Sequence, residues 1–324
     1  MGLKWKMQHI NNGCASACFA MLLSHYGIDK EDFEVIEETY MPFLVYYDIE
    51  RDIFRAGVMM QNHDTFNNMS KKYNLEFVES KCSSWDVFFE QVSSLLKNNN
   101  PFMTGIAKGF IPSKAYDEIR KTNNKLGGHT IVIYKKDNNL FWALDPSGGL
   151  DRSKGYQFAD VKELVEIKIN SKQLKEGIES KEGKRFLIGY LRKSDSFDAK
   201  SLDEQIEVSR KAMLMFKTKM HNFKTILSKD PETNNYRKYM KYVLNYIKPI
   251  TMDFRNAVEA IKNKTDTQKI LISKLKKLQQ ITISCQRNIK RNGVENDDYF
   301  AELASLTDLI HETILCHLNS PSKI

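Results

Sequence analysis

The 324-residue sequence lacks several features that would place it in a specialised structural class. Its five cysteines, at positions 14, 18, 82, 285 and 316, are too few for a disulfide framework and form no standard zinc-binding pattern. No apolar run approaches the length of a membrane span, and the N-terminus has neither an apolar signal core nor a myristoylation motif. There is no Walker A motif. We therefore expect a cytoplasmic protein with no metal ion and no membrane partner.

Composition is typical of a soluble globular protein, with 41% hydrophobic and 28% charged residues, and the length suggests two domains. Charge is unevenly distributed. The segment from Ser196 onward has 22 Lys and Arg against 15 Asp and Glu, whereas the preceding segment has 27 against 26. A basic surface can bind nucleic acid, anionic lipid or an acidic protein, or it can be a solvated face. We do not expect nucleic acid, because the basic segment lacks the interleaved aromatic residues of a nucleic-acid groove.

Cys14 has the sequence context of a reactive thiol. The preceding residues 11–13, Asn-Asn-Gly, are typical of a turn and a helix cap, and the helix-forming residues 15–26 end at Gly27. Cys14 is therefore predicted at a helix N-terminus, where unpaired N–H groups and the helix dipole favour the thiolate. The alternative is a small buried cysteine that begins an ordinary helix. Cys18, one turn later, is expected to be such a packed core residue.

A predicted β-hairpin carries a histidine and an aspartate. Its strands cover 127–134 and 140–145 and are joined by a polar turn. If the last residue of the first strand pairs with the first residue of the second, His129 lies directly opposite Asp145, within hydrogen-bond reach. The alternatives are a histidine satisfied at a strand end and an aspartate that begins an Asp-Pro turn.

These residues, with Gln8, supply the four parts of a cysteine acyl-transfer site. The Cys14 thiolate would attack a carbonyl carbon, and the His129 imidazole would take and return the proton. The Asp145 carboxylate would orient the imidazole, and the Gln8 side-chain amide would bind the oxyanion.

The pattern Gln-x5-Cys…His…Asp-Pro, with Cys-x-x-x-Cys-x-x-Met at the first cysteine, resembles the C39-type cysteine peptidases, bacteriocin-leader processing domains with a papain-like fold. It is also similar to the butirosin-type acyltransferases and to the amide synthase of closthioamide biosynthesis, which join acyl thioesters to amines. The resemblance covers about residues 5–193 and implies the four roles given above. Two features depart from the peptidases: Gly-Cys-Ala replaces their usual Asp-Cys-Gly, and no membrane-spanning transport domain follows.

The fold expected from this pattern is α+β and papain-like, with an N-terminal helix carrying the cysteine and an antiparallel sheet carrying the histidine and aspartate. Helices are predicted over 14–26, 30–39, 64–73, 85–97, 114–121 and 160–166, and strands over 75–78, 101–107, 127–134, 140–145 and 186–192.

A polar linker over 194–200 is predicted to separate a catalytic domain, 1–193, from an α-helical domain, 201–324. Helices are predicted over 202–227, 236–261, 270–289 and 299–318. Pro249 is expected to kink or break the second of them. A coiled coil is the weaker alternative, because the apolar stripe keeps no strict heptad.

Three functions are consistent with this pattern. The favoured one is an acyltransferase or amide synthase of thiotemplated antibiotic biosynthesis, which moves an acyl group from a carrier-protein thioester through Cys14 to a small-molecule amine. The second is a cytosolic C39-type peptidase, and the third is a catalytically silent peptide-binding module. No cofactor is expected, and the phosphopantetheine arm of an acyl or peptidyl carrier protein is expected only as the carrier of the substrate. The basic helical domain is expected to bind that carrier, with a homodimer through this domain as the alternative.

Overall fold

The computed structural model describes residues 2–113, 116–121, 128–147, 150–151, 157–158, 165–180, 186–196, 199–222, 225, 232–292 and 297–319. The chain forms two compact units. The first comprises Met1–Val35 and Gln61–Ala199, and the second comprises Ile36–Met60 and Lys200–Ile324. The predicted catalytic domain, 1–193, includes Ile36–Met60, so the structure corrects its composition by assigning this segment to the helical unit.

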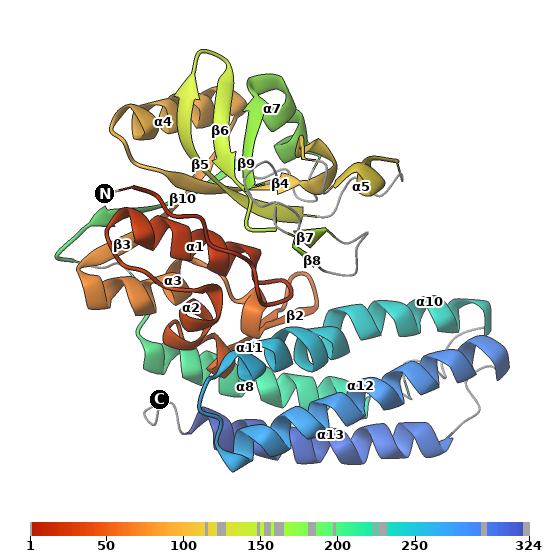
Figure 1. The fold of residues 1–324 in the computed structure, drawn as a ribbon. Coiled ribbons are helices and arrows are strands. Elements are labelled where there is room, and N and C mark those ends of the chain that lie inside the picture. The colour runs from red at the N-terminus through yellow and green to blue at the C-terminus, as the bar shows by residue number, and fades with distance from the viewer. Residues whose placement is uncertain are drawn as a thin grey trace. The chain divides into compact units, whose positions relative to one another are not determined.

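The first unit is built on a six-stranded antiparallel sheet with the order β3-β10-β4-β5-β6-β9 (Figure 1). Its strands are β3 Leu75–Cys82, β4 Phe102–Ala107, β5 Gly128–Asp137, β6 Leu140–Leu144, β9 Glu166–Asn170 and β10 Phe186–Lys193, and the short strands β7 Leu150–Asp151 and β8 Gln157–Phe158 pair separately. Its helices are α1 Cys14–His25, α3 His63–Ser70, α4 Trp85–Lys97, α5 Asp117–Lys121 and α7 Ser171–Glu179, with 3-10 turns η3 Lys71–Tyr73 and η4 Lys108–Phe110. Helix α2, Asp32–Glu38, begins in this unit and ends in the second.

Alternating side chains give the sheet two apolar faces. On one face, Phe19 of α1 stacks on Phe66 of α3 with a centroid separation of 4.3 Å, and both rings contact Phe77 of β3. On the other face, α4 and α7 bury residues such as Phe88 and Leu174 against the strands. Helix α1 is therefore held in the core, and the residue at its N-terminus has a fixed position.

Strand β9 and helix α7 are among the elements of this unit that have no counterpart among the predictions. The predicted helix over 160–166 lies largely outside the described residues, and its last residue, Glu166, instead begins strand β9. Helix α7 follows directly and has a capping box, in which Asn170 accepts from the N–H of Gln173 while the Gln173 side chain accepts from the N–H of Asn170. The first two residues of the predicted helix over 114–121 are likewise outside the described residues, and α5 covers its end.

The hairpin between β5 and β6 has a tighter turn than predicted. Asp137, rather than Tyr134, pairs with Leu140. The pairing register shifts between Ile133 and Lys135, earlier in β5. Asn138 adopts a left-handed φ of 49° in the short turn, a conformation that asparagine tolerates. The predicted direct opposition of the histidine and the aspartate is therefore wrong, and their contact arises by another route.

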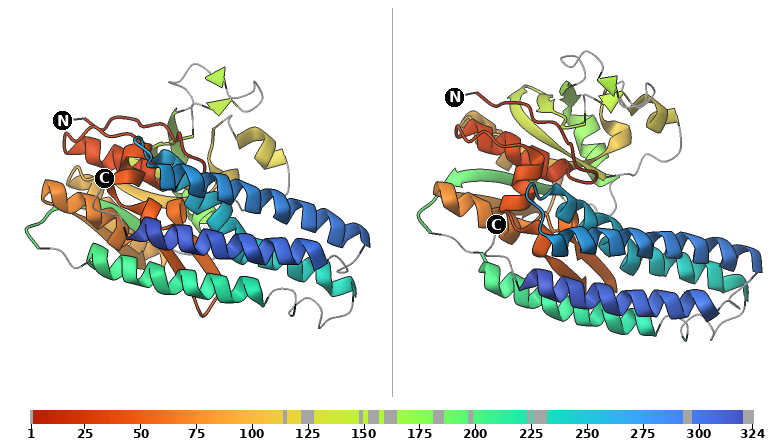
Figure 2. Two further views of the ribbon diagram at one scale, coloured as in Figure 1. Left: turned by 90° about the horizontal axis from the view of Figure 1, so that it is seen from below. Right: turned by 60° about the horizontal axis from the view of Figure 1, so that its bottom comes forward.

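The second unit contains a small two-stranded sheet, β1 Val45–Asp48 and β2 Ile53–Ala56, with 3-10 turns η1 Met41–Phe43 and η2 Gly57–Met59. Its long helices run side by side (Figure 2). They are α8 Leu202–His221, α10 Glu232–Tyr242, α11 Arg255–Ala260, α12 Asp266–Asn292 and α13 Asp297–Leu318. Among the helices that the structure describes, none combines the length and the apolar character that a membrane span requires.

Pro249 was predicted to kink or break its helix, and the break does not occur, because helical residues continue on both sides of it. The chain from α10 to α11 passes through two π-helical segments, η7 Val243–Ile247 and η8 Pro249–Phe254. Proline lacks an N–H and crowds the preceding turn, so a wider turn accommodates it within a continuous helical path.

The segment Ile36–Met60 belongs to the second unit because its apolar residues pack among the helices. Phe54 contacts the rings of Phe216 and Tyr246, each at a centroid distance of 5.7 Å. The N–H of Val45 donates to Ser209 Oγ at 2.9 Å. Without this segment the helices would lose part of their core.

Gly57 provides a test of this packing. It has a φ of +52°, and a Cβ there would lie 2.3 Å from the carbonyl oxygen of Asp253 and 2.6 Å from Cα of Phe254. These are backbone atoms that cannot rotate away. We expect Gly57→Ala to lower the free energy of unfolding by about 2 kcal/mol or more, measured by chemical denaturation. The control Met59→Ala removes a side chain that is 47% exposed and should change stability by no more than about 0.5 kcal/mol. An unchanged unfolding midpoint for Gly57→Ala would contradict the packing.

Candidate active site

The candidate nucleophile, Cys14, is the first residue of α1. Gly13 is the N-cap residue and its N–H donates to the carbonyl oxygen of Ile10 at 2.9 Å. A Cβ on Gly13 would lie 2.9 Å from that same oxygen, so the tight turn requires glycine. Cys14 is half-buried, whereas the helix behind it from Ala15 to Ser24 is buried.

The structure brings Cys14, His129 and Asp145 into one hydrogen-bonded series. His129 Nε2 lies 2.7 Å from Asp145 Oδ1, and both side chains are almost completely buried. The Cys14 thiol lies close enough to His129 for the imidazole to lower its pKa, and its Sγ lies 3.7 Å from Thr130 Oγ1. Because Nε2 faces the carboxylate, Nδ1 is the ring nitrogen left for the thiol.

Asp145 reaches the histidine from just beyond the end of β6, rather than from a paired position across the hairpin. Its N–H donates to the carbonyl oxygen of Val165 at 3.0 Å. Its own carbonyl oxygen accepts from Trp5 Nε1 at 2.8 Å. These two anchors fix the backbone of Asp145, so its carboxylate meets His129 without cross-strand pairing.

The charges in this series shift one another's pKa values. Burial alone would raise the pKa of Cys14, but the hydrogen bond and charge of His129, with Thr130, lower it to about 7. Burial would lower the pKa of His129, but the Asp145 carboxylate and the thiol raise it to about 9. The pKa of Asp145 is lowered, because its hydrogen bonds and the charge of His129 outweigh the effect of burial. A thiolate–imidazolium pair is therefore favoured between about pH 7 and pH 9.

Two further residues satisfy the Asp145 carboxylate. Tyr116 donates its hydroxyl to Oδ2 at 2.8 Å, and the N–H of Ser147 donates to Oδ1 at 2.8 Å. Burial and the neighbouring carboxylate raise the pKa of Tyr116, which keeps the phenol protonated as a donor. The Asp-Pro-Ser sequence could have predicted the Ser147 contact as an Asx turn. No pattern in the sequence pointed to Tyr116.

Gln8 is joined to the same segment. Its N–H donates to the carbonyl oxygen of Pro146 at 2.9 Å, and its Oε1 accepts from Ser147 Oγ at 3.0 Å. Its Nε2 donates to the carbonyl oxygen of Ile10 at 2.9 Å. The amide is thus held with its nitrogen toward the turn that precedes Cys14. An amide nitrogen carries two protons, so the contact with Ile10 uses only one of them.

Cys18 lies one turn after Cys14 and is completely buried, with its Sγ 3.3 Å from the carbonyl oxygen of Thr130. Burial and the nearby charges of Cys14 and Asp145 raise its pKa well above the ordinary value, so it stays a thiol. Within the described part of the chain, no group of three or more His, Cys, Asp or Glu side chains is arranged to hold a metal ion.

The sequence matches the model of the Peptidase_C39 like family over residues 2–172, which is more than half of the chain. The chain belongs to the Peptidase_C39 like family. Its first unit has the mixed helical and antiparallel β-structure predicted for that relationship, and the predicted papain-like, C39-type relationship is confirmed.

Two solved structures are similar to this chain. A C39-like peptidase from Bacillus anthracis shares 16% sequence identity at a TM-score of 0.37, with 60% of this chain and 96% of that chain covered. The peptidase domain of Streptococcus ComA, a bifunctional ABC transporter involved in a quorum-sensing pathway, shares 13% identity at a TM-score of 0.33, with 59% and 98% covered. No curated protein matches the chain.

The pairing of Cys14 with His129 predicts the pH dependence of thiol alkylation. Iodoacetamide should modify Cys14 with a half-maximal rate near pH 7. His129→Ala should move this midpoint to higher pH, because only the Thr130 hydrogen bonds then remain to offset the rise in thiol pKa caused by burial. Peptide mass spectrometry would separate Cys14 from the exposed Cys316.

The matched control for this measurement is His25→Ala. His25 lies at the opposite end of α1, so its removal should leave the alkylation midpoint of Cys14 unchanged. An unaltered midpoint in folded His129→Ala would show that the imidazole does not activate the thiol.

Proposed function

We propose that this protein is a cysteine-dependent acyltransferase that forms an amide bond. Cys14 would take an acyl group from a carrier-protein thioester and pass it to an amine. The observation that carries the proposal is the hydrogen-bonded series of Cys14, His129 and Asp145. A thiol, an imidazole and a buried carboxylate in this order are the parts of a covalent acyl-transfer mechanism.

In the first half-reaction, the Cys14 thiolate attacks the thioester carbonyl carbon. A bond forms between Sγ and this carbon, and the bond to the sulfur of the phosphopantetheine arm breaks. The His129 imidazolium supplies the proton to the departing thiolate. In the second half-reaction, an amine attacks the acyl-enzyme, His129 takes its proton, and Cys14 leaves as the thiolate.

Each half-reaction passes through a tetrahedral intermediate whose oxyanion needs donors. We assign this role to the Gln8 amide proton not used by Ile10 and to the N–H of Cys14 at the start of α1. The Ser147 hydroxyl supports this assignment, because it occupies Gln8 Oε1 and keeps the amide nitrogen on the other side.

The second unit is rich in Lys and Arg, and this supports a carrier protein as the acyl donor. The carrier that we propose has an acidic surface, which would complement the positive charge of this unit. The exposed cations Arg237 and Lys241 lie one turn apart on α10, and Arg287 and Lys290 are exposed near the end of α12. These two stretches adjoin, since Tyr239 donates to the Thr282 carbonyl oxygen at 2.7 Å. We define these four cations as the basic patch. A carrier docked there would bind more weakly as salt rises.

The test compares one acyl group on an acidic carrier protein and on a small free thiol, at low and high salt. Intact-protein mass should show an acyl adduct that is lost in Cys14→Ala, and an added amine should yield the amide. The carrier-bound donor should be preferred at low salt, and this preference should shrink at high salt. Arg287→Glu/Lys290→Glu should remove the preference. Lys269→Glu/Lys276→Glu, an equal change of charge in the first half of α12, should retain it.

Several outcomes would count against the proposal. Absence of an acyl adduct on Cys14 would exclude the acyl-enzyme. Equal use of both donors at every salt concentration would exclude recognition of a carrier by the basic patch.

Peptide hydrolysis is the second candidate, and membership of the Peptidase_C39 like family favours it. The acyl-enzyme would be the same, but it would arise from a peptide amide, and water would take the place of the amine. Release of free acid from a peptide substrate, with no amide formed when amines are added, would favour this alternative.

Gln8→Ala tests the oxyanion assignment. Loss of one such donor typically lowers kcat by a factor of about 100 to 1,000, and we expect KM to change little. Gln91→Ala, the same substitution at a half-buried residue that bonds Ser80 and Cys82, is the matched control and should keep normal turnover. A rise in KM alone would assign Gln8 to substrate binding instead.

A further inference from the structure

The N-terminus of α1 lacks a cap from its own sequence. The N-cap residue, Gly13, has no side chain, and no side-chain hydrogen bond from the N-cap position closes the first turn. The first N–H groups of a helix have no partners within the helix and require acceptors from elsewhere. The carbonyl oxygen of Gly13 accepts from the N–H of Ala17 at 3.1 Å.

A distant glutamine supplies an acceptor. Gln61 Oε1 accepts from the N–H of Ala15 at 3.1 Å, and Gln61 Nε2 donates to the carbonyl oxygen of Asn12 at 3.2 Å. One side-chain amide therefore spans the turn that contains Cys14, with one bond before the cysteine and one after it. Asn12 itself has a left-handed φ of 64°, so the turn depends on contacts of this kind.

We propose that Gln61 is a positioning residue that holds Cys14 in register with His129. This inference rests on the proposed role of Cys14 as the nucleophile. The pKa of the Cys14 thiol is lowered chiefly by His129 and further by Thr130, and both contacts require a fixed helix terminus. Gln61 accepts the hydrogen bond of the Ala15 N–H. The N–H of Cys14 is then the backbone donor next to the reacting sulfur, where we propose that it binds the oxyanion.

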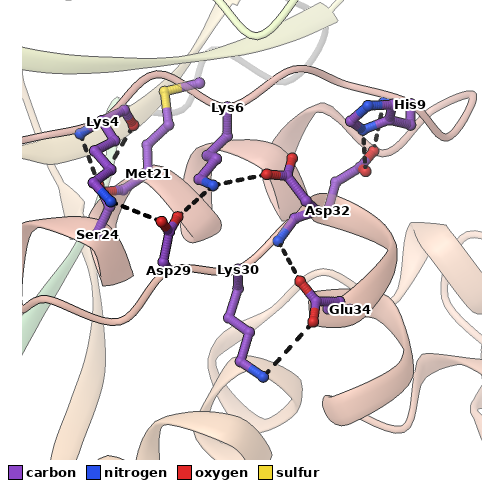
Figure 3. Close-up of polar contacts among 10 residues, drawn as sticks. Lys4, Lys6, His9, Met21, Ser24, Asp29, Lys30, Asp32 and Glu34 are labelled. Atoms are coloured by element: carbon purple, nitrogen blue, oxygen red, sulfur yellow. Dashed lines mark hydrogen bonds and ion pairs between the residues drawn. The ribbon is translucent and has the colours of Figure 1, made fainter.

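A second tether explains why loss of Gln61 should leave the fold intact. The fully buried carboxylate of Asp32 accepts from the N–H of His9 at 2.7 Å and from the N–H of Ile10 at 2.8 Å. It also bonds the His9 ring, as Figure 3 shows. The loop between Gln8 and Cys14 would thus stay attached at its first half when Gln61 is replaced, and only its second half would loosen.

The experiment measures the pH dependence of Cys14 alkylation by iodoacetamide in the full-length protein. In Gln61→Leu we expect the midpoint to rise by about one pH unit from its value near 7, because the bond to His129 is weakened. The matched control is Gln91→Leu, which removes a half-buried amide that bonds Ser80 and Cys82 in the same unit. This control should keep the wild-type midpoint.

Gln61→Glu is the second variant and guards against misfolding of Gln61→Leu. Its carboxylate still accepts from the N–H of Ala15, but it cannot donate to Asn12 and places a negative charge near the thiol. The midpoint should again rise. A wild-type midpoint in either folded Gln61 variant, or an equal rise in Gln91→Leu, would overturn the proposal. Because alkylation needs no substrate, an upward shift without any acyl adduct would refute the acyltransferase and leave the role of Gln61 intact.

Discussion

The burial of the His129–Asp145 pair is the constraint on which the site depends. A carboxylate removed from water is strongly destabilising unless its oxygens are hydrogen-bonded and a counter-charge lies nearby. Here the imidazole and the Ser147 N–H serve one oxygen, and the Tyr116 hydroxyl serves the other. This satisfied carboxylate keeps the imidazole protonated at neutral pH, and the imidazolium in turn lowers the pKa of Cys14.

The segment that contains Ser147 also joins the His129–Asp145 pair to Gln8, the residue that we propose as an oxyanion donor. Ser147 contributes its N–H to Asp145 and its hydroxyl to Gln8, so one residue orders two parts of the site. The bond to Asp145 comes from the Ser147 backbone and the bond to Gln8 from its side chain, so the position of this backbone segment fixes both. The catalytic candidates His129 and Gln8 are therefore connected through Asp145 and Ser147, the residues that hold them in place.

The sequence predicted those parts of the first unit that depend on local signals. Helix α4 has the predicted bounds, because Ser84 caps it and its apolar residues recur at helical spacing. Strand β9 was missed although its residues alternate between buried and exposed, because its first residue, Glu166, was assigned to the predicted helix over 160–166. The hairpin register was wrong because Asn138 allows a shorter turn than the polar run suggested.

In the candidate site, too, the features that depend on local sequence signals were predicted and those that depend on tertiary contacts were not. The sequence motifs and the predicted hairpin identified Cys14, His129 and Asp145 as neighbours. They did not predict that Asp145 contacts His129 from a position beyond the end of β6. Tyr116 and Gln61 contact the site through tertiary folding alone, at sequence separations of 29 residues from Asp145 and 46 from Ala15. A single sequence carries no periodicity or spacing that reports such contacts, so only the folded chain could identify them.

The division of the chain has a consequence for this site. The segment Ile36–Met60 packs with the helical unit, yet the residues that hold the nucleophile loop adjoin its ends: Asp32 precedes it by four positions, and Gln61 follows it directly. The composition of this segment gave no boundary, because its aromatic residues would suit the core of either unit. Its membership of the second unit means that the chain leaves and re-enters the catalytic unit at the supports of Cys14. Asp32 and Gln61, whose side chains bond the loop before Cys14 and its first helical turn, therefore lie close to the two points at which the chain passes from one unit to the other.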